Sequence, residues 1–310
     1  MDLSSGREGG KNMRILLENA VFTAEIESFG AELKSLVRKE GNMEYMWEAD
    51  PAFWGKTSPI LFPFIGKLEG GKYQYNDIEF VMDKHGFARD MDFTVLKQEA
   101  DQVVFTIKSN ENTLQKYPFT FALEVEYQLT ENGIIESLRV INQDEKTMYF
   151  SFGGHPAFAC PVKTGTAKKR TEYAVKLYGA EGKVNVLSTE IGVPDGLLTG
   201  KNIEIKLDNG VFPITDGIFD QDALCLAQQH VRAVGLLDEN GREYIRLEAD
   251  CPVWGIWSMP DSNAGYVCIE PWWGICDPKG YQGTLQQRPY TNQAEAGKTW
   301  ECSYRIFAGK

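Results

Sequence analysis

Regular alternation of apolar and polar residues is the main pattern along this chain. In the segment FALEVEYQLT, residues 121–130, apolar side chains recur at every second position. A period of two is typical of a β-strand that buries one face. The segment IIESLRVIN follows after a short break, so the two segments predict a β-hairpin with its turn at Asn132-Gly133.

Two other segments carry the same pattern. AVGLLDENGREYIRLEA predicts a hairpin that turns at Asn240-Gly241, and DFTVLKQEADQVVFTIKS predicts one joined through residues 99–102. Helical periodicity is scarce, and ENTLQKYPF predicts a single helical turn before Pro118.

Strand-sized segments recur from Arg14 to Phe307, and no linker rich in glycine, serine or proline divides them. We therefore predict a single all-β domain over residues 13–310, in the form of a large antiparallel β-sandwich. A propeller would require a repeated blade motif, which the sequence lacks.

The opening segment, MDLSSGREGGKN, differs from the rest of the chain. It has no apolar core of the kind that a signal peptide requires. We predict that residues 1–12 are an artificial linker or a disordered tail, and that the natural chain starts at Met13.

Charge and composition narrow the possible partners. The 310 residues carry a formal net charge of −12, which disfavours nonspecific binding to nucleic acid. The apolar runs are too short to span a membrane, for which about 18 residues are needed.

Six cysteines show no CxxC spacing, which favours reduced thiols in the cytoplasm. Scattered histidines and unpaired cysteines also argue against a structural zinc site.

A few ionisable residues stand at positions suited to acid–base chemistry. His85 lies in KHGFARDMDF and His155 in SFGGHPAFACP, where glycine and proline let a ligand approach closely. Glu270 ends the apolar run of AGYVCIEPWWGICD, and partial desolvation there would raise its pKa towards the range of a general base. Each residue also has a structural interpretation, as a hydrogen-bonded histidine or as a carboxylate paired with an arginine at a strand edge.

Five segments, taken in order, resemble a known family. They are SPILFPFIGKLEGGKY, KHGFARDMDF, SFGGHPAFACP, IFDQDAL and CIEPWWGICD. Their order is similar to that in the aldose 1-epimerase (galactose mutarotase-like) family, and above all in its bacterial aldose 1-epimerase-like branch. The resemblance extends from about Met13 to the end of the chain. It implies the large β-sandwich of that family, the galactose mutarotase-like supersandwich, which agrees with the alternation.

The resemblance also implies a role for each matching residue. Glu270 matches the general base that takes a proton from the anomeric hydroxyl, and His155 matches the general acid that protonates the ring oxygen. His85 matches a histidine that hydrogen-bonds the sugar, and Asp222 matches an aspartate that accepts hydrogen bonds from sugar hydroxyls. The implied reaction interconverts the α and β anomers of an aldohexose and needs no metal or organic cofactor.

Two basic residues, both expected to contact the substrate, leave alternatives open. Lys67 stands where the best-known galactose mutarotases carry arginine, and lysine lacks the planar fork that grips two oxygens. Arg89 matches an arginine of hexose-6-phosphate epimerases, but their second arginine has no counterpart here. The alternatives are a hexose-6-phosphate 1-epimerase and a non-catalytic carbohydrate-binding or regulatory protein. In each case the expected partner is a sugar, with no nucleic acid and no membrane, and the oligomeric state is left open.

Aromatic residues accompany these motifs. Phe158, Trp272 and Trp273 are candidates for contact with the apolar face of a sugar ring. Core packing is the interpretation that we favour for each of them.

Overall fold

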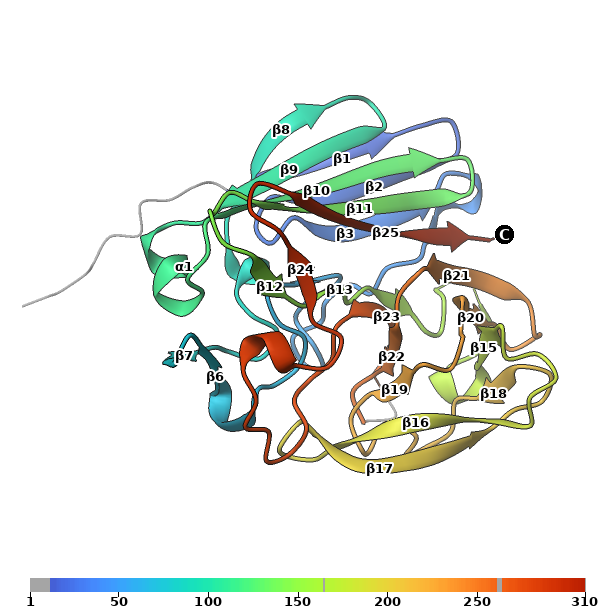
Figure 1. Cartoon of the computed structure of the whole chain (residues 1–310). Coiled ribbons are helices and arrows are strands. Elements are labelled where there is room, and N and C mark those ends of the chain that lie inside the picture. The colour runs from blue at the N-terminus through green and yellow to red at the C-terminus, as the bar shows by residue number, and fades with distance from the viewer. Residues whose placement is uncertain (1–11, 164, 261–263, 310) are drawn as a thin grey trace, which may run out of the picture.

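The computed structural model describes residues 12–163, 165–260 and 264–309 (Figure 1). The tail predicted over residues 1–12 lies outside the described residues, except for Asn12. In the described part of the chain strands dominate, and the longest helix is the short α1 (Glu111–Lys116). Single 3-10 turns lie at η1 (Glu40–Asn42), η2 (Glu69–Gly71), η3 (Ala88–Asp90), η4 (Arg170–Glu172) and η5 (Leu285–Gln287). The all-β prediction is confirmed.

Two large antiparallel sheets form the body of the molecule. The first has nine strands in the order β18 (Val211–Pro213), β15 (Ala174–Tyr178), β20 (Ala233–Leu237), β21 (Glu243–Ala249), β25 (Thr299–Ala308), β11 (Gly133–Asn142), β10 (Phe121–Thr130), β9 (Gln102–Lys108) and β8 (Thr94–Gln98). The second has eight strands, in the order β17 (Leu197–Lys206), β16 (Asn185–Gly192), β19 (Leu224–Ala227), β22 (Val253–Trp257), β23 (Tyr266–Trp273), β13 (Phe152–Gly154) and β5 (Ile60–Leu61), with β14 (Ala157–Ala159) also paired to β23.

Three smaller sheets complete the fold. They are a four-stranded sheet of β1 (Arg14–Glu18), β2 (Phe22–Glu27), β3 (Glu32–Arg38) and β4 (Met43–Glu44), and the pairs β6 (Lys72–Tyr75) with β7 (Ile78–Val81) and β12 (Met148–Phe150) with β24 (Asn292–Ala294). The four-stranded sheet lies against the β8–β11 part of the nine-stranded sheet (Figure 1). This layering of antiparallel sheets confirms the predicted sandwich.

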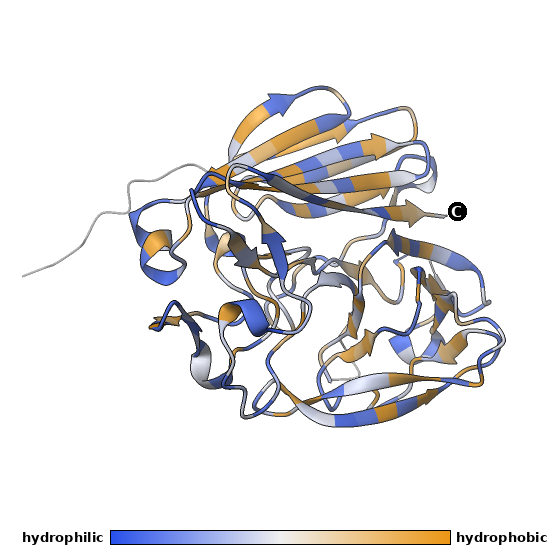
Figure 2. Ribbon diagram, viewed as in Figure 1, coloured by the Kyte–Doolittle hydropathy of each residue, from blue (hydrophilic) through white to orange (hydrophobic). Residues whose placement is uncertain are grey.

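Side-chain alternation explains how the sheets pack. Along β10, Leu123, Val125 and Tyr127 are fully buried, whereas the residues that separate them are partly exposed. Figure 2 shows the same alternation of hydrophobic and hydrophilic residues along β10 and β11. The inward-facing residues join one large hydrophobic core.

The β10–β11 hairpin turns one residue earlier than predicted. Thr130 pairs with Gly133, so the two loop residues are Glu131 and Asn132. Gly133 belongs to the strand, where a Cβ would lie 2.0 Å from the carbonyl oxygen of Ile306. The glycine therefore permits the close approach of β25 and does not form the turn.

The other local predictions are confirmed. Gly241, with a φ of +75°, lies in the turn between β20 and β21. The amide of Glu99 donates to the carbonyl of Gln102 at 2.8 Å and closes the β8–β9 turn. Helix α1 is capped by the side chain of Asn110 and ends before Pro118.

Strand β23 is buried on both faces, and this position shields the residues that it carries. Val267 and Ile269 face the main core. Because side chains alternate along a strand, Cys268, Glu270 and Trp272 point to the opposite face. Loops and aromatic side chains cover that second face, so a carboxylate there is removed from water without entering the main core.

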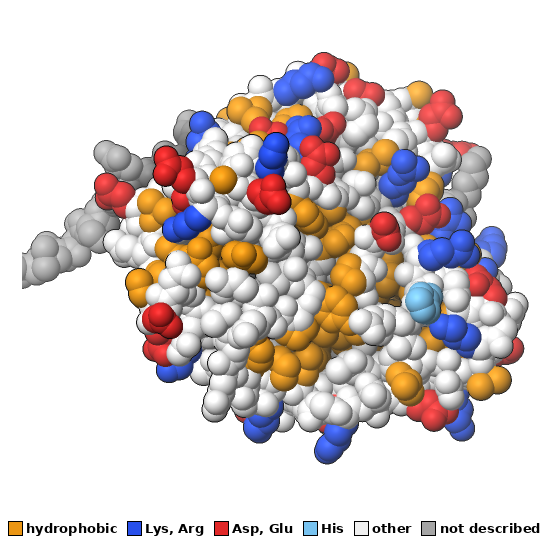
Figure 3. Space-filling model, viewed as in Figure 1, with side chains coloured by type: hydrophobic (Ala, Val, Ile, Leu, Met, Phe, Trp, Pro, Cys, Tyr) orange, Lys and Arg blue, Asp and Glu red, His pale blue; other side chains and the backbone are white. Residues whose placement is uncertain are grey.

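The surface charges, the helix lengths and the state of the cysteines can be compared with the predictions made from composition. Acidic and basic side chains are interspersed on the face shown in Figure 3. Within residues 12–163, 165–260 and 264–309, no helix is long and apolar enough to cross a membrane. All six cysteines are free, as predicted for reduced thiols. The cytoplasmic location and the lack of nucleic-acid and membrane partners stay predictions.

Candidate active site

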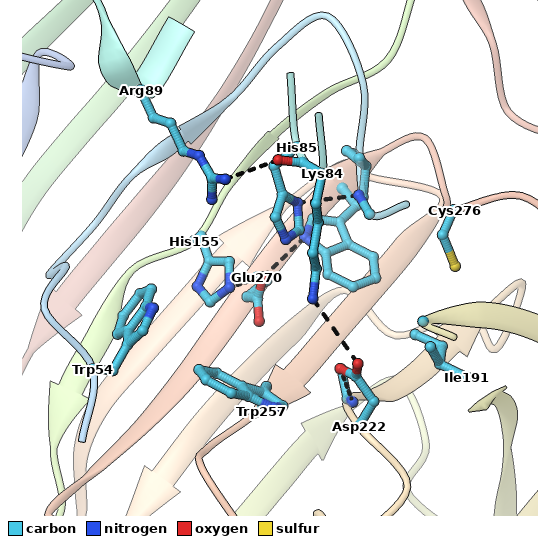
Figure 4. Close-up of a pocket in the computed structure, with 15 residues that line it drawn as sticks. Trp54, Lys84, His85, Arg89, His155, Ile191, Asp222, Trp257, Glu270 and Cys276 are labelled. Atoms are coloured by element: carbon cyan, nitrogen blue, oxygen red, sulfur yellow. Dashed lines mark hydrogen bonds and ion pairs between the residues drawn. The ribbon is translucent and has the colours of Figure 1, made fainter. Parts of the chain in front are cut away.

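A pocket of about 190 Å³ lies against the second face of the eight-stranded sheet (Figure 4). It brings together five of the six residues predicted from the motifs, although they come from distant parts of the chain: His85, Arg89, His155, Asp222 and Glu270. The other lining residues are Trp54, Ile65, Gly66, Lys84, Ile191, Gly196, Ala223, Trp257, Trp272 and Cys276. The pocket is therefore polar at its ionisable groups and apolar elsewhere, as is common for small-molecule sites.

Glu270 supplies a deeply buried carboxylate. Its side chain is 1% exposed, and strand pairing places it opposite Gly255 of β22. The indole N–H of Trp272 donates to its Oε2 at 3.2 Å. Burial raises the pKa of Glu270 well above its usual value; Asp222 raises it further, whereas the ammonium of Lys84 opposes the shift. The carboxyl group therefore keeps its proton over a wider pH range than an ordinary glutamate does.

His155 lies in the bend between β13 and β14, with its Nε2 3.1 Å from the Oε2 of Glu270. The Trp54 ring packs against the imidazole at a tilt of 31°, with 4.8 Å between ring centroids, and Trp257 meets the imidazole edge-on at 5.8 Å. Burial lowers the pKa of His155 to about 3, and the positive charge of Lys84 contributes to the shift. The aromatic rings thus hold a neutral imidazole beside the carboxyl group.

Burial sets the order in which the His155–Glu270 pair loses its protons. Since both charged forms are disfavoured, the pair holds one proton from about pH 3 up to the raised pKa of Glu270. The two atoms lie at hydrogen-bonding distance, so this proton can pass between them. Such a pair can take a proton from one atom of a ligand while it delivers a proton to another.

His85 enters the pocket from a turn with unusual backbone geometry. The φ angle is +69° at His85 and +72° at Gly86, where a Cβ would lie 2.2 Å from the carbonyl oxygen of Phe62. The amide of Gly66 donates to Nδ1 of His85 at 3.1 Å, so the neutral ring carries its proton on Nε2. Burial lowers the pKa of His85 well below its usual value. The ring therefore offers a hydrogen-bond donor to a ligand.

Lys84 is a pocket residue that sequence reasoning missed, although it directly precedes His85. Its ammonium lies 4.0 Å from Oδ2 of Asp222, and Figure 4 shows the two side chains facing each other. Asp222 adopts a φ of +66°, and its Oδ1 accepts a hydrogen bond from the amide of Ala223 at 2.8 Å. The aspartate is thus held in place with part of its carboxylate open to a ligand.

The two basic residues expected to contact substrate differ in position. Arg89 lines the pocket, and its guanidinium donates to the carbonyl of Lys84 at 2.8 Å. Lys67 lies behind the rim: its ammonium donates to the carbonyl of Pro194 at 3.2 Å, and its stem lies beside Gly196, which lines the pocket. A direct contact between Lys67 and substrate stays a prediction.

The aromatic residues of the motifs divide between core and pocket. Phe158 is fully buried in the main core, and the indole N–H of Trp273 donates to the carbonyl of Asp250. Core packing is confirmed for Phe158. Trp272 lines the pocket, together with Trp54, for which the motifs carried no signal.

One group in the described part of the chain could offer ligands to a metal ion. His155, Cys268 and Glu270 each place one ligand atom within 4.8 Å of the others. A cation bound there would replace the hydrogen bond between His155 and Glu270 and would occupy both ionisable groups. The prediction that no metal or cofactor takes part stays a prediction.

The protein is thus a β-sandwich with two imidazoles and a buried carboxyl group around one pocket. Proteins of this class can exchange protons with a small polar ligand bound in the pocket. Comparison with known proteins identifies the family. The model of the aldose 1-epimerase family matches residues 13–280, and the chain belongs to this family. Membership implies an isomerase of the mutarotase type that acts on sugars.

Known relatives match along almost their whole length. The chromosomal protein LacX of Lactococcus lactis subsp. lactis is 31% identical over 303 residues, which cover 95% of this chain and 99% of that protein. A galactose mutarotase-like protein from Lactobacillus casei ATCC 334 is 31% identical, with a TM-score of 0.88 over 96% of this chain and all of that one. A galactose mutarotase related enzyme from Lactobacillus acidophilus is 30% identical, with a TM-score of 0.85 over 96% of this chain and 98% of that one. The predicted family and fold are therefore confirmed.

Proposed function

We propose that this protein is an aldose 1-epimerase that interconverts the α and β anomers of an aldohexose without a cofactor. The observation that carries the proposal is the contact of 3.1 Å between His155 and Glu270 inside a pocket that His85 and Asp222 also line. Mutarotation removes one proton from the anomeric hydroxyl and returns one to the ring oxygen. A pair that shares a single proton meets both needs.

In the proposed mechanism, Glu270 accepts the proton of the anomeric hydroxyl while His155 delivers one to the ring oxygen. The bond between C1 and the ring oxygen breaks, and an open-chain aldehyde forms. Rotation about C1–C2 presents the other face of the carbonyl, and the same proton transfers in reverse close the ring. His85 donates from Nε2 to a sugar oxygen, and Asp222 accepts hydrogen bonds from sugar hydroxyls.

Polarimetry of freshly dissolved α-glucose and α-galactose tests the proposal directly. We expect the protein to accelerate the approach to the equilibrium rotation of at least one common aldohexose. Calorimetry with the same sugars distinguishes the remaining alternative, a carbohydrate-binding or regulatory protein. Sugar binding without any acceleration would refute the catalytic proposal and support that alternative.

A phosphorylated sugar is a second candidate substrate, favoured by one observation. Lys84 and Arg89 both line the pocket, so two cations border the space where a sugar would bind. If the substrate is a hexose 6-phosphate, acceleration should be confined to the phosphorylated anomer and should fall in Arg89→Ala. Equal rates with the free and phosphorylated sugars would exclude this version.

A further inference from the structure

Trp272 contacts the carboxyl group that the proposed function uses as a base. It lies two residues after Glu270 on β23, and both side chains point to the pocket face of the strand. Its indole N–H donates to Oε2 of Glu270 at 3.2 Å, and His155 reaches the same oxygen at 3.1 Å. No hydrogen bond among the described residues falls on Oε1, so this second oxygen is left for a ligand.

Two glycines make room for the indole ring. A Cβ on Gly153 would lie 2.9 Å from Cδ1 of Trp272, and a Cβ on Gly255 would lie 2.6 Å from its Cζ2. These glycines pair with β23 from its two sides, in β13 and β22. Neither has a positive φ, so the backbone conformation does not require glycine there. A side chain at either position would therefore collide with the indole, which lies against both neighbouring strands with its N–H at the carboxylate.

We propose that Trp272 is a positioning residue for Glu270: its N–H, fixed between Gly153 and Gly255, orients the carboxylate so that Oε1 faces the anomeric hydroxyl. This inference rests on the proposed function. The N–H also stabilises the ionised form of the carboxyl group, because a donor favours the charge that accepts its hydrogen bond. The other titratable groups that interact with Glu270 from the surrounding elements are Lys84, His155, Asp222, Cys225, Tyr266 and Cys268.

The substitution Trp272→Phe removes the N–H and keeps an apolar ring in the pocket. Trp273→Phe is a matched control, because Trp273 neighbours Trp272 on the same strand but donates to the carbonyl of Asp250. We expect Trp272→Phe to lower kcat by about 10- to 100-fold with little change in KM, since a lost hydrogen bond to a charged group has effects of this order. The limb of the pH profile that Glu270 governs should move to higher pH. Trp273→Phe should change thermal stability alone.

Gly255→Ala gives a second route to the same test, because its methyl group should displace the indole while leaving the N–H in the molecule. It should reproduce the fall in kcat and the shift of the pH limb. An unchanged kcat and pH profile in folded Trp272→Phe would overturn the proposal, as would equal effects of Trp272→Phe and Trp273→Phe.

An NMR measurement separates failure of this inference from failure of the proposed function. In protein labelled with ¹⁵N-tryptophan, the indole N–H signal that disappears in Trp272→Phe belongs to Trp272. We expect this signal to move as Glu270 titrates, and to stop moving with pH in Glu270→Gln. The result needs no enzymatic activity. A signal insensitive to both pH and Glu270→Gln would refute the hydrogen bond on which the inference depends.

Discussion

At the scale of single residues, burial decides the chemistry that the pocket can perform. An exposed glutamate and histidine would lose their protons in the usual order, the carboxyl group first. In this pocket the pKa of His155 falls to about 3 and that of Glu270 rises well above its usual value, so the order is reversed. Transfer of one proton from Glu270 to His155 gives the carboxylate and the imidazolium that the proposed mechanism needs. This transfer does not change the total number of protons on the pair.

The pH profile of turnover should reflect this reversed order. We expect a bell shape whose acid limb lies near pH 3, where His155 adds a second proton to the pair. The alkaline limb should appear where Glu270 releases the last proton, above the usual range of a carboxyl group. The measurement is kcat/KM against pH in the free enzyme. A rate that declines steeply between about pH 7 and pH 5 would contradict the reversed order.

The same pair should behave as one unit under mutation. Glu270→Gln and His155→Asn should each lower kcat by about 10²–10⁴-fold with little effect on sugar affinity, because each removes one proton-transfer group. The double mutant should be only slightly slower than the slower single mutant. His85→Asn should combine weaker binding with slower turnover. A folded Glu270→Gln protein that turns over at the normal rate would refute the mechanism.

At the scale of elements, the β16–β17 hairpin forms one rim of the pocket. Ile191 and Gly196 line the pocket, and the hairpin tip is held by Lys67 at the carbonyl of Pro194. Lys279 also contacts the hairpin tip, because its ammonium lies 2.8 Å from Oδ2 of Asp195. The observed contact of Lys67 is therefore with the rim, and the direct contact with substrate expected from the sequence stays a prediction.

We expect Lys67→Met to raise KM by about 3- to 10-fold, because the rim loses an anchor beside the sugar. The kcat and both limbs of the pH profile should stay unchanged, since the acid–base pair is untouched. Lys279→Met is the control: its ion pair is largely exposed and therefore contributes little. Steady-state kinetics on the accepted sugar provide the readout. Equal KM values in all three proteins would rule out a role for Lys67 at the rim.

At the scale of the whole molecule, the sandwich buries another carboxyl group, on an inner strand of the nine-stranded sheet. Glu136 of β11 is 1% exposed and accepts a hydrogen bond from the hydroxyl of Tyr304 on β25. Burial raises the pKa of Glu136 to about 8, and the hydrogen bonds oppose the shift only in part. Glu136 is therefore protonated in the folded protein at neutral pH.

This burial makes stability depend on pH. The unfolded chain releases the Glu136 proton near the ordinary value of 4.5, whereas the folded protein keeps it to about 8. Between these values the folded state binds more protons, so the free energy of unfolding should fall as pH rises, by roughly 1–4 kcal/mol in total. Glu136→Gln should flatten this dependence, whereas Glu124→Gln, at a half-buried position on β10, should not. Denaturant unfolding at several pH values tests both expectations, and parallel curves for wild type and Glu136→Gln would contradict them.

The sequence by itself determined the strands, two of the three hairpin turns and five of the ionisable residues that line the pocket. These features follow from local rules, because a period of two needs only neighbours in the chain, and the motifs match the family segment by segment. Tertiary structure alone decided the rest. Gly133 lies in a strand and not in the turn because β25 approaches it closely, and Lys67 finds its hydrogen-bond partner, Pro194, 127 residues further along the chain. The reversed proton order of His155 and Glu270 has the same origin: both groups lose water only when distant segments close over them.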